Sequence, residues 1–251
     1  MRSRLRRMLL LAGTLLPALH SFAGPIPVVP RPPEGMNVQG FGASGSVPWS
    51  IVIVLTVLTL LPAILLSMTP FVRLLVVFHF LRQALGTQST PTNQTLIGLA
   101  LLLTWFLMQP VGMAIQQQAI VPFQHGRITA LQAVDAGAQP LKSFMLRFVR
   151  EKDVALFVEL SGSARPRTPN ELPMRVVAPA YLLSELKAGF QIGAVLFLPF
   201  LVVDLVVAAI TTSVGMLQLP PVVISTPLKI LLFVMVDGWN LLIGSLMRSF
   251  A

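Results

Sequence analysis

Single charged residues interrupt long apolar stretches of this chain, and they constrain its fold more than any other feature. No charge occurs in the 24 residues from Trp49 to Val72, and Arg73 then interrupts the stretch. Asp204, Lys229 and Asp237 stand alone in equally apolar surroundings. A charge at the centre of a bilayer costs roughly 2.5–3.5 kcal/mol on insertion scales, so four of them facing lipid would cost on the order of 10–14 kcal/mol. We therefore expect these four charges to be buried against protein, in an assembly of several subunits.

Composition excludes an ordinary soluble fold. Hydrophobic residues make up 55% of the 251 positions and charged residues 11%, and the mean hydropathy is +0.80. Polar groups are too few to cover the apolar surface, so lipid or other protein must cover it. We expect an all-α membrane protein of two helical hairpins, with four hydrophobic spans kinked by proline, flanking a small helical extracytoplasmic domain.

The first 23 residues have the pattern of a secretory signal peptide. Four arginines between positions 2 and 7 precede an apolar stretch, and Ser21 and Ala23 are the small residues of a cleavage site. We predict cleavage between Ala23 and Gly24, which lowers the formal net charge from +9 to +5 by removing those arginines. No remaining basic patch alternates with aromatic residues, so nucleic-acid binding is not expected.

The rest of the chain divides into four segments. Residues 24–48 are a Pro/Gly-rich linker, in which a G-x-G-x-x-G match lacks the preceding strand that a dinucleotide site needs. Residues 49–115 form the first hairpin, kinked at Pro62 and Pro70. Residues 116–187 form the small helical domain, and residues 188–251 form the second hairpin.

Residues 116–187 carry nine Lys/Arg and six Asp/Glu. Thr129 is placed to cap a short helix, and Pro140 suits the first turn of another. The second helix carries an apolar stripe at Leu141, Phe144, Met145 and Phe148. The basic charge alone would put this domain in the cytoplasm, but the positive-inside rule is reliable only for loops of up to roughly 60 residues. The signal peptide places the domain in the periplasm.

The second hairpin turns at Pro220-Pro221 and contains two further patterns. Gly189 and Gly193 form a small-xxx-small face for close helix packing, which we expect between subunits. In an antiparallel hairpin that turns near Leu219, Lys229 lies about one helical turn from Asp204. The two residues would therefore pair directly, or each would reach a neighbouring subunit.

Catalytic, metal and cofactor signatures are absent from the sequence. The chain has no cysteine, and no zinc-protease, serine-hydrolase or Walker A pattern occurs. Asp204 and Asp237 could form an intramembrane carboxylate pair, but their apolar neighbours supply no activating group. We expect neither enzymatic activity nor a cofactor or metal site.

Three groups of residues resemble the FliP family, the membrane component of the bacterial flagellar type III export gate. The first is Phe71, Arg73, Leu81-Arg82, Ala84-Leu85-Gly86-Thr87, Pro91 and Asn93-Gln94; the second is Pro179-Ala180-Tyr181, Ser184-Glu185-Leu186-Lys187 and Gly189-Phe190-Gln191-Ile192-Gly193; the third is Val236-Asp237-Gly238-Trp239 and Gly244-Ser245-Leu246. Together they extend the resemblance from about Trp49 to the C-terminus.

The resemblance implies a homo-oligomer that forms a channel with FliQ and FliR in the cell inner membrane, at the flagellar basal body. Unfolded flagellar subunits would pass through the channel. The resemblance also implies contacts with FlhA and FlhB, and an assembly factor of the FliO type. The hairpins would be lifted partly above the lipid and packed on protein, which would lower the cost of their charges.

Family members often carry methionines before the Pro-Pro turn, and these are thought to close the pore. Met216, Leu217 and Gln218 occupy this place, so the resemblance implies a mixed Met/Leu constriction, with ordinary turn-flanking residues as the alternative. Two other functions stay open: an injectisome export-gate subunit, whose family tends to lack the signal peptide and linker, and an ion-coupled transporter subunit, which would show an internal repeat.

Overall fold

The chain is helical throughout the part that the structure describes. The structure, a computed structural model, describes residues 49–87, 89–162, 168–215 and 220–250. The α-helices are α2 (Trp49–Ser67), α3 (Phe71–Ala84), α4 (Asn93–Ile115), α5 (Val121–Gln124), α6 (Ala130–Phe148), α7 (Glu151–Leu160), α8 (Met174–Ser213), α9 (Pro221–Met235) and α10 (Gly238–Arg248), with a π-helix at Gln116–Ile120 and a 3-10 turn at Pro169–Glu171. These residues contain no strand, so the predicted all-α class is confirmed for them.

Two helical stretches are long and apolar enough to cross a membrane by themselves. They are Asn93–Gln124, which joins α4 to α5 through the π-helix, and Met174–Ser213. The pair α2 and α3 and the pair α9 and α10 reach that length only together, and they bend by 71° and 66°. The described residues thus supply two candidate spans, or up to four if each bent pair is one span.

The bend between α9 and α10 has a local cause. Asp237 takes a left-handed conformation, with φ 50° and ψ 51°, that ends one helix and starts the next. Gly238 follows, and a side chain there would overlap the ring of Phe233. Glycine therefore lets α10 turn back closely over α9. The sequence predicted one span for this half of the second hairpin, and the structure builds it from two helices that meet at this bend.

Helix α8 is 40 residues long, which corresponds to about 60 Å at 1.5 Å per residue. It begins at Met174, so the predicted boundary between residues 187 and 188 falls inside it. Pro179 and Pro199 lie within the helix without ending it. The polar residues before position 188 do not end it either, because neighbouring helices bind them, as described below.

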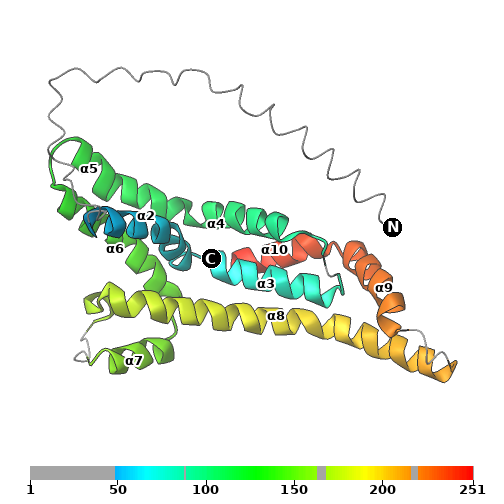
Figure 1. The fold of residues 1–251 in the computed structure, drawn as a ribbon. Helices are drawn as coiled ribbons and strands as arrows, with labels where there is room; N and C mark the ends of the chain where they lie inside the picture. The colour runs from blue at the N-terminus through cyan, green and yellow to red at the C-terminus, as the bar shows by residue number, and fades with distance from the viewer. Residues whose placement is uncertain (1–48, 88, 163–167, 216–219, 251) are drawn as a thin grey trace, which may run out of the picture. The chain divides into compact units, whose positions relative to one another are not determined.

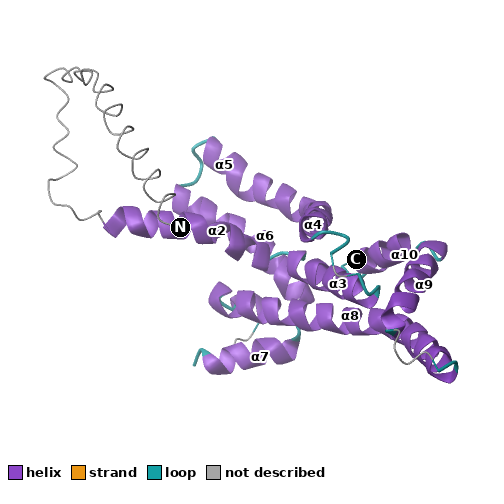
Figure 2. Cartoon of the chain, turned by 45° about the vertical axis from the view of Figure 1, so that its right-hand side comes forward, coloured by secondary structure: helices purple, strands orange, loops and turns teal. Residues whose placement is uncertain are grey.

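Two hydrophobic cores form along α8. In the first, α3 lies against α8 together with α4, α9 and α10, around Leu74, Phe78, Leu81, Phe200 and Leu246 (Figure 1). In the second, α6 and α7 pack on the N-terminal part of α8, around Met145, Val158, Val177 and Tyr181 (Figure 2). The predicted stripe of α6 contributes to the second core, since Met145 is fully buried and Leu141, Phe144 and Phe148 pack against it.

Helix α6 begins where the sequence predicts, but it does not stop before Pro140 as the sequence predicts. Thr129 accepts a hydrogen bond from the backbone N–H of Gln132, and the Gln132 side chain accepts one from the backbone N–H of Thr129. This capping box confirms the predicted N-cap. Pro140 does not begin a second helix, because α6 continues through it from Ala130 to Phe148.

Candidate functional site

Polar side chains on α8 bind partners on three other helices, and these contacts are the site that the structure defines. Ser184, Glu185 and Lys187 lie in the N-terminal half of α8, and Asp204 lies in its C-terminal half. Their partners come from α3, α7 and α9. The long helix thereby carries every ion pair found among the described residues.

The most buried of these contacts joins Arg73 on α3 to Glu185 on α8. Nε of Arg73 donates to Oε2 of Glu185 at 2.9 Å, and Nη2 donates to Oε1 at 2.5 Å. Nη1 donates to the hydroxyl of Ser249 at 3.1 Å, and the guanidinium carbon lies 3.9 Å from the centroid of the Phe250 ring. A fork of two parallel hydrogen bonds suits arginine rather than lysine. The site therefore ties three segments distant in sequence, α3, α8 and the end of α10, to one guanidinium.

A second network joins α7 to α8 at Asp153. The carboxylate is ion-paired with Lys187, and its Oδ2 accepts from the hydroxyl of Ser184 at 2.7 Å. The Ser184 hydroxyl also accepts the backbone N–H of Arg150 at 3.0 Å, and Nη2 of Arg150 donates to Gln191 at 2.6 Å. Burial raises the pKa of Asp153, but hydrogen bonds from Lys187 and Ser184, with the charges of Lys187 and Arg150, lower it by more. The pKa of this carboxyl group therefore lies below its ordinary value.

The third contact pairs Asp204 on α8 with Lys229 on α9. Nζ of Lys229 donates to Oδ2 of Asp204 at 2.5 Å. The Lys229 side chain is only 4% exposed, whereas that of Asp204 is 32% exposed. The two residues that the sequence placed about one turn apart thus form an ion pair within one chain, between the helices of the second hairpin.

Asp237 differs from the other predicted buried charges. Its side chain is exposed in this chain, at the bend between α9 and α10, and its Oδ2 accepts from Nδ2 of Asn240 at 3.1 Å. The sequence placed this carboxylate in the interior of an apolar helix. The helix breaks at that position, so Asp237 precedes the first residue of α10 and is exposed in the single chain. Its burial within an assembly stays a prediction.

Gly189 and Gly193 pack within the chain, and the prediction that they pack between subunits was wrong for this face. Both are buried under α3. A Cβ atom at Gly189 would lie 3.0 Å from Val76, and one at Gly193 would lie 2.5 Å from the ring of Phe80. The absence of side chains lets α3 approach α8 closely, which also brings Arg73 within reach of Glu185.

The remaining predicted positions lie outside the described residues. These are the cleavage site at Ala23 and Gly24 and the constriction at Met216, Leu217 and Gln218. The structure does show how α8 ends before them, because Gly215 takes a left-handed conformation with φ 78° directly after the last helical turn.

Reasoning from the sequence missed Glu185 and Asp153 as ion-pair partners. Glu185 was named only as part of a motif, and Asp153 was counted only among the six acidic residues of positions 116–187. The sequence does contain a feature that indicates a partner for Glu185. This residue lies next to the apolar stretch of α8, where an unpaired charge is costly and charged residues therefore pair with opposite charges. Among the described residues, no three His, Cys, Asp or Glu side chains lie close enough together to hold a metal ion.

Long apolar helices whose charged side chains are paired with neighbouring helices define a helical membrane protein. Comparison with known proteins gives the family. The FliP family model matches residues 54–246, and the chain belongs to that family.

Several curated relatives agree with this assignment. The chain is 48% identical to the flagellar biosynthetic protein FliP of Pectobacterium carotovorum subsp. carotovorum, over 83% of this chain and 81% of the relative. It is 43% identical to that of Cereibacter sphaeroides, over 98% of this chain and 82% of the relative. It is 46% identical to that of Bacillus subtilis, over 80% of this chain and 90% of the relative. The resemblance to the family that the sequence motifs indicated is confirmed.

Proposed function

We propose that this chain is a core subunit of the flagellar type III protein export gate, through which unfolded flagellar subunits leave the cell. The family membership over residues 54–246 carries this proposal, together with relatives that are named flagellar biosynthetic protein FliP. In this role the chain forms part of the wall of a protein-conducting channel and needs no cofactor. It lies in the cell inner membrane at the flagellar basal body, with the domain of α6 and α7 in the periplasm.

The apolar surface of the single chain supports a role within an assembly. Trp105 on α4 is 80% exposed, and its neighbours Leu102 and Phe106 are exposed with it. Most of α2 is exposed as well, although its residues are almost all apolar. Such faces must be covered by lipid or by protein. We assign them to further copies of this chain, to FliQ and FliR, and to membrane lipid.

The ion pairs on α8 support a mechanical role in that assembly. Two hydrophobic cores and three ion pairs fix α3, α7 and α9 to one long helix, which ends directly before residues 216–219. In the proposal, Met216, Leu217 and Gln218 form the constriction of the pore. Apolar side chains in a narrow pore exclude water and ions until substrate separates them. A rigid α8 would hold this turn in a fixed position around the channel.

The proposed partners follow from the family resemblance. FliQ and FliR complete the channel, FlhA and FlhB dock to it, and a FliO-type factor assists its assembly. Purification of an affinity-tagged chain from membranes under mild detergent tests this directly. FliQ and FliR should appear in fixed ratio to the tagged chain, and recovery of a lone dimer would contradict the proposal.

A gene deletion separates the flagellar proposal from its alternatives. Deletion should abolish swimming and remove flagellin from the culture medium without slowing growth, and the wild-type gene in trans should restore both. Normal motility with loss of another secreted protein would assign the chain to an injectisome gate. Normal motility with an altered ion requirement for growth would favour a transporter subunit.

A further inference from the structure

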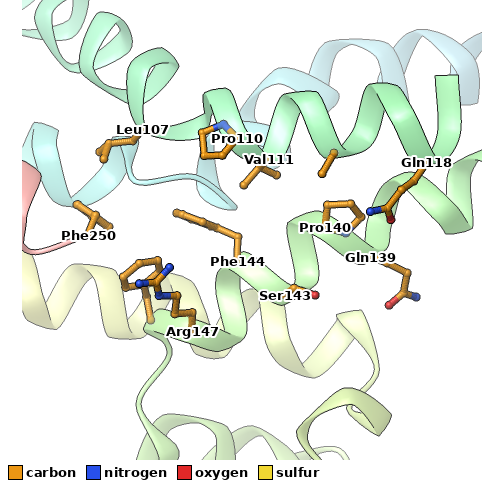
Figure 3. Close-up of a pocket in the computed structure, with 12 residues that line it drawn as sticks. Leu107, Pro110, Val111, Gln118, Gln139, Pro140, Ser143, Phe144, Arg147 and Phe250 are labelled. Carbon is orange, nitrogen blue, oxygen red and sulfur yellow. The ribbon is translucent and has the colours of Figure 1, made fainter. Parts of the chain in front are cut away.

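A cavity of about 490 Å³ lies between α4 and α6 (Figure 3). Leu107, Pro110 and Val111 line it from α4, and Phe144 and Arg147 line it from α6. Its volume falls within the range of roughly 300–1,000 Å³ that is typical of ligand pockets. Its wall is apolar over most of its length, but a guanidinium group stands at one end, so an amphiphilic molecule would fit it better than a purely apolar one.

Arg147 is the charged group of this cavity. Among the described residues it makes no ion pair, in contrast to Arg73, and its guanidinium carbon lies 5.5 Å from the centroid of the Phe148 ring. Ser143 lies one helical turn earlier on the same face of α6 and also lines the cavity. An exposed guanidinium beside an aromatic wall is suited to two parallel hydrogen bonds with a phosphate or carboxylate group.

The position of the cavity along α4 narrows the class of ligand. A helix that enters the hydrocarbon core at Asn93 crosses its thickness of roughly 30 Å in about 20 residues, which is close to Gly112. Residues of α4 line the cavity from Leu107 to Ala114, and Gln118 of the π-helix lines it further on, so the lining brackets this level. At this edge of the hydrocarbon core, the phosphate groups of phospholipids lie directly beside their own acyl chains.

We infer that this cavity binds one phospholipid. The phosphate group accepts hydrogen bonds from Arg147, and the hydroxyl of Ser143 donates to an ester oxygen. One acyl chain lies against Pro110, Val111 and Phe144. A bound lipid of this kind would cover the gap between α4 and α6 and so join the candidate span to the helical domain.

Native mass spectrometry of the purified full chain with added phosphatidylglycerol tests the inference. The wild type should retain one lipid per chain, and Arg147→Gln should bind it about tenfold or more weakly, because a hydrogen-bonded charge pair is lost. Arg175→Gln is the matched control, since Arg175 is exposed and does not line the cavity. Equal binding by wild type and Arg147→Gln would overturn the inference.

The apolar part of the cavity requires a separate variant. Ala114→Phe should fill it and weaken lipid binding, whereas Met113→Phe on the same helix should not, because Met113 is 50% exposed and does not line the cavity. Loss of lipid in both variants, or in neither, would contradict an acyl chain in the cavity.

Two further outcomes identify a different occupant. Excess inorganic phosphate should not displace the lipid, and full displacement would make the cavity a site for free phosphate. A photoreactive amino acid at Ser143 should yield a lipid adduct in membranes. A crosslink to protein in place of a lipid adduct would show that a partner chain fills the cavity and would overturn the inference.

Discussion

At the scale of single residues, the Arg73–Glu185 pair should dominate the stability of the fold. Both side chains are almost fully buried. Glu185→Gln leaves the guanidinium charge without its carboxylate, which we expect to cost about 3–5 kcal/mol of unfolding free energy. Unfolding of the purified chain in detergent, followed by circular dichroism, measures the loss. Glu159→Gln is the control, because Glu159 is exposed and should change stability by less than about 0.5 kcal/mol.

The Asp204–Lys229 pair should respond unequally to loss of its two members. Asp204→Asn leaves a nearly fully buried ammonium group unpaired, whereas Lys229→Met leaves a carboxylate that is less buried, because that side chain is 32% exposed in the single chain. We expect the first change to reduce unfolding free energy and complex yield more than the second. The exchange of Asp204→Lys with Lys229→Asp should recover part of the loss, and no recovery would mean that the two residues depend on other partners in the assembly.

At the scale of helices, contact between α3 and α8 depends on glycine. Gly193→Ala places a methyl group 2.5 Å from the ring of Phe80, which itself packs edge-on against Phe190 with ring centroids 5.4 Å apart. We expect a loss of about 1–3 kcal/mol in unfolding free energy, as for other overpacked interiors. Gly112→Ala has open space around it and should be neutral or slightly stabilising. Equal stability of the two variants would contradict the close contact.

Attachment of α7 to α8 should depend on pH through Asp153. The pKa of this carboxyl group is lowered in the folded chain, so its contribution to stability is fully present above the ordinary value of 3.8 and is lost as the pH falls through the folded value. The protection factors of the α7 amides, which are corrected for the intrinsic pH dependence of exchange, should therefore be constant from neutral pH to about pH 5 and should fall only in stronger acid. Asp153→Asn should raise exchange at neutral pH. A fall in these protection factors near pH 6 in the wild type would point to another group.

At the scale of the whole molecule, orientation in the membrane can be tested without background labelling, because the chain has no cysteine. Glu159→Cys marks the helical domain, and Thr90→Cys marks the turn between α3 and α4; both positions are exposed. A maleimide that cannot cross the inner membrane should label Glu159→Cys in spheroplasts and should label Thr90→Cys only after permeabilisation. The reverse pattern would place the helical domain in the cytoplasm.

The sequence alone determined the features that depend on neighbouring residues. Apolar stretches with few charges fixed the helical class, and the Thr129-x-x-Gln132 pattern fixed the start of α6, because helix formation and capping involve residues three or four positions apart. The motifs also indicated the family, and the Lys229–Asp204 contact was within reach because only residues 214–220 separate α8 from α9 in the sequence.

Only the tertiary structure decided which distant groups meet. Arg73 and Glu185 are 112 positions apart, and no local pattern relates them. Gly189 and Gly193 indicated close packing, but the partner helix turned out to be α3 of the same chain. Asp237 lies at the start of α10 and not inside a helix, because the chain bends there. In each case the result depends on how helices cross in space, since the burial of a side chain is a property of its neighbours and not of its own sequence.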